Sequence, residues 1–253
     1  MTVRHGNAGG RAVRVITQAL RRQGFCIVPG LISARRCAQL RAAMRCMLEG
    51  EREQNLRPTG HQRVLHLAAK DRRFLDLVQH PLVLAVWRSY LGEDMLCSSL
   101  TGNALWPGST EQYWHVDHPY WTMAEPYPVS LPLAGQTIWM LDDFTRENGA
   151  TAGLAGSHQR GRLPRLDSRW PKGATPITGR CGSAILMDGA LWHTSTPNRS
   201  PAVRSAVLVK YIRSFCVTQE DMRHQLAAVQ RPTRTLARLF GAEQYVPTRK
   251  FPY

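Results

Sequence analysis

The chain of 253 residues is 43% hydrophobic and 20% charged, and its 33 lysines and arginines outnumber its 18 aspartates and glutamates, which gives a formal net charge of +15. This length is enough to bury a large core, so the fold needs neither a second domain nor disulfide bonds. The 6 cysteines show no Cys-x-x-Cys spacing, which argues against a disulfide framework and favours reduced thiols.

Residues 1–14 carry charge and glycine but no apolar segment of the kind found in secretory signals. No stretch approaches the roughly 18 consecutive apolar residues of a membrane-spanning helix. The sequence therefore predicts a protein of the reducing cytoplasm with no membrane partner.

Residues 1–94 predict a mainly helical flank with one short strand, because apolar side chains recur at helical spacing between capping residues and glycine stops. A polar loop is expected between residues 50 and 74. In order, the predicted elements are a helix over 11–23 ended by Gly24, a strand over 25–28, a helix capped by Ser33 and ended near Gly50, a helix over 74–78, and a helix over 82–91 that follows Pro81.

Residues 95–216 alternate short apolar runs with turn residues, which is typical of a β-sandwich or barrel. Asn148-Gly149 is the strongest hairpin signal in this stretch, since both residues tolerate the left-handed backbone of a tight turn. Trp139 and Met140 are neighbours on a predicted strand, so one faces the interior and the other does not. The sequence does not say which.

The C-terminal part returns to helical periodicity, with a helix over 218–230 broken by Pro232, a shorter helix to Phe240 and a tail that ends Phe251-Pro252-Tyr253. No internal repeat or linker separates these parts. The simplest account is one domain over 1–253, made of a helical flank over 1–94, a strand-rich core over 95–216 and a helical tail over 217–253.

His115 and Asp117 are two residues apart, so on an extended backbone their side chains point the same way. An imidazole and a carboxylate placed like this can bind one metal ion from one side. In a chain with 9 histidines, chance alone would produce such a pair in about one chain of two. The pair therefore needs a third ligand to indicate a metal site.

His193 is the candidate for the third ligand, because it ends an apolar segment over residues 184–193 that predicts a buried strand. Two histidines and one carboxylate form a facial triad. That ligand set leaves three positions of an octahedral metal open, which suits non-haem Fe(II), whereas a structural zinc site would close four positions, usually with cysteine.

Arg204 follows His193 after a turn-forming stretch, and residues 198–201 would make the loop of an antiparallel hairpin. In that register Ser195 faces Arg204, and His193 faces Ala206 on the same side of the sheet. The guanidinium would then point toward the metal and grip a carboxylate, with the Ser195 hydroxyl as a further donor.

Together these motifs resemble the phytanoyl-CoA dioxygenase-like family of Fe(II)/2-oxoglutarate oxygenases. Residues 141–150, followed by 156–158, are similar to that family's approach to its Pro-Gly-Ser-His loop, with Ala155 in place of the usual proline. The segment 193–204 resembles its distal histidine, the serine two residues on, and its cosubstrate-binding arginine. The resemblance spans residues 95–215 and implies a mainly β fold: a double-stranded β-helix core, of the jelly-roll or cupin type, with flanking helices.

The resemblance implies that His115, Asp117 and His193 hold Fe(II), and that Arg204 with Ser195 binds the cosubstrate 2-oxoglutarate. Reaction with O2 would release succinate and CO2, and C–H hydroxylation is the default outcome. Related halogenases carry Gly or Ala at the position of Asp117, so this carboxylate argues against halogenation. Desaturation, epoxidation and rearrangement stay open, because the way the substrate is held decides among them.

Gln112 and Asn103 are further candidates to hydrogen-bond the cosubstrate, although both are otherwise ordinary residues of a sheet edge or a turn. His118, Tyr120 and Trp121 directly follow the first two ligand candidates and are expected to line the substrate pocket. His118 is equally suited to a role at the end of a strand.

A basic run between Arg160 and Lys172 is rich in proline and glycine and predicts a loop at the mouth of the site. Through Arg160 and Arg162 it could hold an anionic group of the substrate, a carboxylate or a phosphate. The alternative is a solvated loop of no specificity.

The positive charge is unevenly placed, since no lysine or arginine occurs from Ser89 to Thr145, the stretch that holds His115 and Asp117. A nucleic-acid groove centred on the metal strand would not be built this way. We therefore expect an oxygenase of a small molecule of specialised metabolism. The alternatives are an oxygenase or demethylase of nucleic acid or protein, and a non-catalytic binding domain on the same scaffold. The oligomeric state is open.

Overall fold

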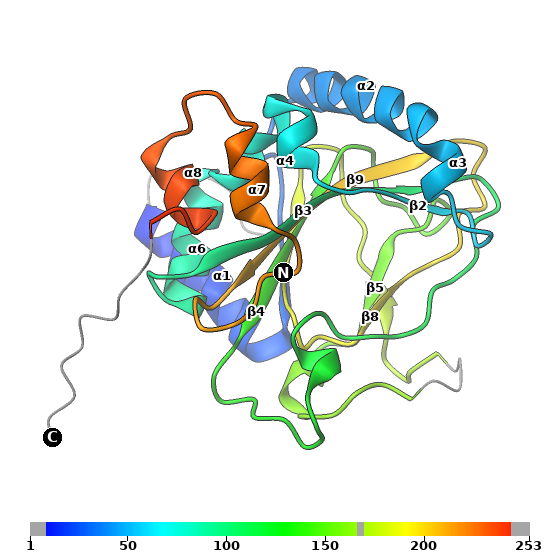
Figure 1. The fold of residues 1–253 in the computed structure, drawn as a ribbon. Coiled ribbons are helices and arrows are strands. Elements are labelled where there is room, and N and C mark those ends of the chain that lie inside the picture. Colours follow the sequence, from blue (N-terminus) through cyan, green and yellow to red (C-terminus); the bar gives the residue numbers. More distant parts are fainter. Residues whose placement is uncertain (1–8, 166–169, 244–253) are drawn as a thin grey trace, which may run out of the picture.

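The computed structural model describes residues 9–165 and 170–243 (Figure 1), so Arg169 of the basic run and the tail ending in Tyr253 lie outside the described residues. The elements are α1 Gly9–Gln23, β1 Phe25–Val28, α2 Ala34–Gly50, α3 Arg52–Asn55, β2 His61–Val64, α4 Leu67–Lys70, a 3-10 turn Arg72–Phe74, α5 Leu75–Val78, α6 Pro81–Leu91, β3 Leu96–Leu105, a 3-10 turn Tyr120–Thr122, β4 Ala134–Met140, β5 Thr151–Gly153, a 3-10 turn Ser157–Gln159, β6 Thr175–Pro176, β7 Ala184–Asp188, β8 His193–Ser195, β9 Arg204–Ile212, α7 Met222–Ala227 and α8 Arg234–Leu239.

Two antiparallel sheets form the centre of the fold. The larger has six strands in the order β1-β7-β4-β9-β3-β2, and the smaller has three in the order β6-β5-β8. Figure 1 shows β5 and β8 on one side of the larger sheet and α1 and α6 on the other. The expected mainly β core with flanking helices is therefore confirmed.

The larger sheet is buried on both faces, which explains its almost continuous apolar strands. The face toward the smaller sheet carries Ile138, Met140, Ile185, Met187 and Leu208, and the face toward the helices carries Trp139, Leu186, Val207 and Val209. Met140 is thus the residue that faces the interior. Trp139 lies beneath the helices, with its ring centroid 5.4 Å from that of His80.

The helices predicted for the first third of the chain are confirmed. Gly24, at a φ of 85°, ends α1, and the Ser33 side chain accepts a hydrogen bond from the Arg36 N–H at 3.2 Å to cap α2. Pro81 opens α6. Near the C-terminus α7 is shorter than predicted, because Asp221 caps it and so starts it later than residue 218.

The loop predicted between residues 50 and 74 instead contains β2, at the edge of the larger sheet beside β3. β2 lacks the alternation of apolar and polar residues that predicts a strand. His61 and Arg63 line a polar interior cavity, and on the other face Gln62 donates a hydrogen bond to the Leu48 carbonyl at 2.7 Å. Because three of its four residues are polar and Val64 alone joins the core, hydrophobic periodicity could not reveal this strand.

The hairpin predicted between His193 and Arg204 is wrong. β8 pairs with β5 in the smaller sheet, whereas β9 pairs with β3 and β4 in the larger sheet. Ser195 therefore lies opposite Thr151, and Arg204 lies opposite Leu105. The turn residues reverse the chain as expected, but the reversal carries it from one layer to the other.

The Asn148-Gly149 signal marks a real turn but not a hairpin. Gly149 adopts a φ of 83°, and the Asn148 side-chain oxygen accepts a hydrogen bond from the Thr145 N–H at 2.8 Å. The strands on either side, β4 and β5, belong to different sheets. Turn chemistry fixes the local backbone, whereas the burial of each strand decides its partner.

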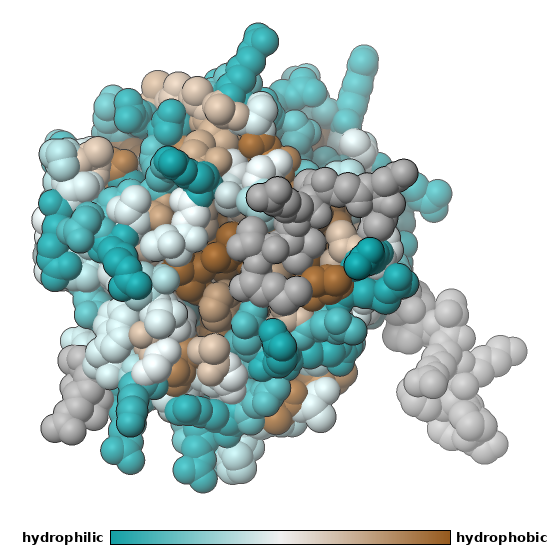
Figure 2. Space-filling model, turned by 180° about the vertical axis from the view of Figure 1, so that it is seen from behind, coloured by the Kyte–Doolittle hydropathy of each residue, from teal (hydrophilic) through white to brown (hydrophobic). Residues whose placement is uncertain are grey.

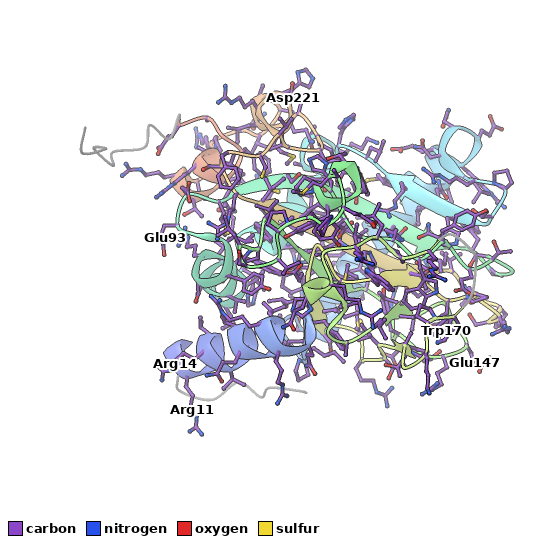
Figure 3. The ribbon with its side chains drawn as sticks, turned by 90° about the horizontal axis from the view of Figure 1, so that it is seen from below. Arg11, Arg14, Glu93, Glu147, Trp170 and Asp221 are labelled. Carbon is purple, nitrogen blue, oxygen red and sulfur yellow. The ribbon has the colours of Figure 1, made fainter. Side chains whose placement is uncertain are left out.

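Hydrophilic side chains cover most of the periphery of the face shown in Figure 2, and hydrophobic side chains gather near its centre. Arg11 and Arg14 project from α1 away from the molecule (Figure 3), as an amphipathic helix requires. Within residues 9–165 and 170–243, every helix is too short or too polar to cross a membrane.

Candidate metal centre

His115, Asp117 and His193 come together between the two sheets. One ligand atom from each of the three lies within 4.8 Å of the others. His115 and His193 form an antiparallel bridge with two N–H to O=C hydrogen bonds of 3.0 Å, and the Asp117 N–H donates to the Gly189 carbonyl at 2.7 Å. Backbone pairing thus fixes the separation of the three side chains.

Each imidazole has one nitrogen in a hydrogen bond and one nitrogen without a hydrogen-bond partner among the described residues. Nδ1 of His115 lies 2.8 Å from the Tyr113 carbonyl, and Nδ1 of His193 lies 2.9 Å from the Leu191 carbonyl. A carbonyl only accepts hydrogen bonds, so Nδ1 carries the proton in both rings. The lone pairs therefore lie on Nε2, in the arrangement that metal-binding histidines usually adopt.

Asp117 is buried, and its two carboxylate oxygens are in different situations. Oδ1 accepts a hydrogen bond from Nζ of Lys210 at 2.9 Å, whereas Oδ2 is buried with no hydrogen-bond partner among the described residues. A buried carboxylate oxygen without a partner is costly, and a metal ion would supply one. The donor set of two imidazole nitrogens and one carboxylate oxygen fits a divalent transition metal.

The three side chains of the cluster have the protonation states that metal binding requires. Burial, followed by the proximity of His193, lowers the pKa of His115 to about 3, and burial also lowers the pKa of His193. Burial raises the pKa of Asp117, but the charges of Lys210 and the two imidazoles outweigh it and hold that pKa at about 2. At neutral pH both rings are therefore neutral and the carboxylate is ionised, so metal binding need not displace protons from them.

Arg204 is buried on β9 of the larger sheet. It is 1% exposed, its guanidinium donates a hydrogen bond to the Gly149 carbonyl, and its Cζ lies 4.3 Å from the centroid of the Phe144 ring. Its Nε has no hydrogen-bond partner among the described residues. Burial lowers its pKa to about 9, which leaves the guanidinium charged at neutral pH.

The other predicted cosubstrate residues are also interior. Ser195 is buried on β8, two residues from His193, and Gln112 lines the cavity beside the triad. Asn103 is buried on β3, and its Oδ1 has no partner among the described residues. Asn103 lies opposite Ala206, two positions along β9 from Arg204, so it shares the facing of that arginine.

The cavity beside the triad has a volume of about 480 Å³, and its wall includes residues that the sequence did not single out. Lys210, six positions after Arg204 on β9, could have been found from the two-residue period of a strand. Gln136 on β4 carries no such signal. Arg63 could not have been found, because its strand was not predicted.

The predicted substrate residues divide into two groups. Trp121 lines the cavity, but His118 and Tyr120 do not: Nε2 of His118 lies 2.8 Å from the Val217 carbonyl, and the Tyr120 hydroxyl accepts a hydrogen bond from the Leu133 N–H at 2.7 Å. Tyr120 is 2% exposed within an apolar cluster. Its role is to pack the core rather than to line the cavity.

Arg160 and Arg162 line a different cavity, of about 680 Å³, whose wall does not include the triad. The guanidinium of Arg160 lies 4.7 Å from the ring centroid of Trp192, and the Trp192 indole N–H donates to the Arg162 carbonyl at 2.8 Å. These arginines therefore belong to a loop that covers the outer side of Trp192. The prediction that they grip the substrate has no support from this placement.

The arrangement of the strands is shared with 2-oxoglutarate-dependent enzymes of the double-stranded β-helix class. The crystal structure of the epimerase SnoN in complex with Fe3+, alpha ketoglutarate and nogalamycin RO superposes with a TM-score of 0.68 at 18% identity, over 83% of this chain and 87% of that chain. At this identity the likeness shows a common fold.

Comparison of the sequence assigns the chain to a family within this fold class. The family model "Phytanoyl-CoA dioxygenase (PhyH)" matches residues 20–206, and the chain belongs to this family. Dioxygenase af480 of Aspergillus fumigatus is 30% identical over 149 residues, which are 59% of this chain and 47% of that protein, so the match spans about half of that relative's length. The ectoine dioxygenase of Nocardia farcinica is 27% identical over 228 residues, covering 75% of this chain and 74% of that protein.

Proposed function

We propose that this protein is an Fe(II)- and 2-oxoglutarate-dependent dioxygenase that hydroxylates a C–H bond of a small-molecule metabolite. The observation that carries the proposal is the set of three free ligand atoms, Nε2 of His115, Nε2 of His193 and Oδ2 of Asp117, held together by the backbone. Membership of a dioxygenase family supports the same conclusion.

The three ligands would occupy one face of the metal. Because Lys210 engages Oδ1 of Asp117, Oδ2 is the oxygen available for the metal, and the carboxylate would bind through one atom. Three positions of an octahedral ion then stay open for a chelating cosubstrate and O2. When bound, Fe(II) and 2-oxoglutarate would activate O2, one oxygen atom of which would enter succinate as 2-oxoglutarate loses CO2 and the other of which would oxidise the substrate C–H bond.

Arg204 and Ser195 would hold the carboxylate of 2-oxoglutarate farther from the metal. A buried guanidinium with an unpartnered Nε is suited to a charge-assisted hydrogen bond with a carboxylate. Gln112, on the cavity wall, and Asn103, which shares the face of β3 and β9 with Arg204, would add neutral hydrogen bonds. Arg57 and Arg63 bring guanidinium groups to the wall of the cavity, and burial lowers the pKa of Arg63.

The choice of hydroxylation rests on the ligand set and on the interior of the site. Asp117 fills the position that a halide would need, and its ion pair with Lys210 holds it in place. SnoN, which has the same fold, is named an epimerase, so the fold alone does not decide the outcome. Where the substrate C–H bond lies relative to the open metal positions decides it.

The proposal is tested by Asp117→Ala, assayed for succinate formation from 2-oxoglutarate with Fe(II) and O2. We expect loss of turnover together with loss of bound iron, because the cluster keeps only two ligands. Asp76→Ala is the matched control, since Asp76 also pairs with a cation, Arg36, but its side chain is 77% exposed and borders a cavity whose wall does not include the cluster. Wild-type succinate formation by Asp117→Ala would refute the assignment.

A further inference from the structure

The cavity beside the triad has a predominantly polar wall. Among the described residues that line it, Leu65 and Trp121 are the ones with apolar side chains, and the others carry amides, hydroxyls, imidazoles or charges. Small-molecule pockets are usually lined mainly by apolar side chains with a few polar groups among them. Here polar side chains outnumber apolar ones, which favours a ligand that is itself polar over most of its surface.

Three buried polar side chains form a row across neighbouring strands of the larger sheet. Lys210 on β9 lies opposite Ser99 on β3 and opposite Gln136 on β4, and all three line the cavity. They are 4%, 6% and 6% exposed, respectively. We name Ser99, Lys210 and Gln136 the polar row. The next inward-facing residue of β9, Leu208, belongs to the apolar cluster between the two sheets. On β9 the polar row therefore ends at Lys210 in this direction.

The polar row has hydrogen-bonding capacity that the protein does not use. Lys210 donates to Oδ1 of Asp117 at 2.9 Å and to Oε1 of Gln219 at 3.0 Å, which leaves a third N–H. Within residues 9–165 and 170–243, the side chains of Ser99 and Gln136 make no hydrogen bond to protein. Because both side chains border the cavity, a bound ligand or water can supply the partners that the protein does not.

The polar row is separate from the part of the site suited to 2-oxoglutarate. Arg204 and Lys210 are six residues apart on one strand, which at about 3.3 Å per residue puts their Cα atoms roughly 20 Å apart. Asp117, which contacts Lys210, lies at the Lys210 end. A cosubstrate gripped by Arg204 would thus leave the polar row free for the substrate.

We propose that the polar row binds a small, hydrophilic substrate that carries hydroxyl, amine or carbonyl groups over most of its surface, such as a sugar, a cyclitol or an amino acid derivative. The inference rests on the proposed function and names the substrate class of that same site. Trp121, which is 45% exposed and has its ring centroid 5.4 Å from Nζ of Lys210, provides a flat wall for the C–H face of such a molecule. An aliphatic acyl chain or a terpenoid would leave the row unpaired.

The test is ligand-observed NMR on protein loaded anaerobically with 2-oxoglutarate and with either Fe(II) or Zn(II). The probes are sugars, cyclitols and amino acids on one side, and fatty acids and terpenoid alcohols of similar size on the other. Paramagnetic broadening with Fe(II) but not with Zn(II) identifies probes that bind beside the metal. We expect it for hydrophilic probes, and we expect Gln136→Leu to weaken their binding at least tenfold.

Gln54→Leu is the matched control, because Gln54 is an exposed residue of α3 and the same substitution there should leave probe binding unchanged. Broadening confined to apolar probes, an absence of any broadened hydrophilic probe, or equal effects of the two variants would each overturn the inference. If calorimetry shows that the metal-loaded protein does not bind 2-oxoglutarate, the proposed function fails and the inference fails with it. If 2-oxoglutarate binds, only the substrate class is at stake.

Discussion

Asp117 shows how one side chain can be held in place and still be available to a metal. Lys210 fixes Oδ1 and leaves Oδ2 free, while the backbone carbonyls of Tyr113 and Leu191 fix the two imidazoles through Nδ1. These contacts orient each ligand atom before any metal arrives, so little conformational entropy is lost on binding. We expect the site to be rigid with and without metal.

The lowered pKa values of the two imidazoles predict how stability depends on pH in the presence of a chelator. The pKa of His115 falls from 6.5 to about 3 on folding, so below pH 6.5 the unfolded chain binds a proton that the folded chain does not. The neutral His115 imidazole therefore makes its full contribution to the free energy of unfolding above pH 6.5, and this contribution is lost as the pH falls toward 3. The loss is at most about 1.4 kcal/mol per pH unit for one histidine.

Urea unfolding at a series of pH values checks this prediction. His115→Asn should flatten the fall in unfolding free energy between pH 6 and pH 4, because asparagine does not titrate. His224→Asn, at an exposed position of α7, should leave the slope unchanged. Identical slopes for wild-type protein and His115→Asn would show that the imidazole is not kept neutral by burial.

Arg204→Lys tests the cosubstrate anchor. Lysine keeps the positive charge but loses the planar fork, so the KM for 2-oxoglutarate should rise about 10- to 100-fold, as expected from roughly 1.5–3 kcal/mol for a hydrogen bond to a charged group. Arg180→Lys is the control, because that side chain is 89% exposed and pairs with Asp143. An unchanged KM in Arg204→Lys would remove the arginine from the cosubstrate site.

At the level of elements, Gly135 sets how closely α6 approaches the larger sheet. A Cβ on Gly135 would lie 2.1 Å from Cζ3 of Trp87, whose indole N–H donates to the Thr137 hydroxyl at 2.8 Å. Trp87 is fully buried, so the indole cannot move aside without breaking that hydrogen bond. The absence of a side chain on β4 therefore makes room for the helix.

Gly135→Ala should lower the free energy of unfolding by about 1–3 kcal/mol, the usual cost of overpacking a core. Gly50→Ala is the comparison, because a Cβ there meets nothing within 4 Å and the position is the last residue of α2. It should be neutral or stabilise by up to about 1 kcal/mol. Chemical denaturation distinguishes the two, and equal stabilities would mean that Trp87 does not pack against Gly135 as described.

Helices bounded by capping residues and glycine stops could be predicted from the sequence. The pairing of strands that are distant in the sequence could not. The capping by Ser33 and the glycine stop at Gly24 bounded helices correctly, because both act within a few residues. β2 was not predicted because three of its four residues, His61, Gln62 and Arg63, are polar. The hairpin between His193 and Arg204 failed because strands that follow one another in the sequence join different sheets, a choice made by burial over long distances.

At the scale of the whole molecule, the same two-layer arrangement explains why the ligands could be predicted while their surroundings could not. His115 and Asp117 lie on one extended segment, and their spacing alone puts both side chains on one side. His193 was predicted from the buried strand that it ends and Arg204 from the turn that follows, and the family resemblance then supported both. The cavity wall is gathered from β2, β3, β4 and β9, whose side-by-side order no local pattern encodes.

The central claim is that the three ligand atoms bind one Fe(II) that in turn binds 2-oxoglutarate. Anaerobic titration calorimetry with 2-oxoglutarate, performed with and without Fe(II), tests it most directly. The account predicts one 2-oxoglutarate bound per chain when Fe(II) is present and a much weaker interaction when it is absent. Tight binding of 2-oxoglutarate without metal, or no binding with it, would contradict the account.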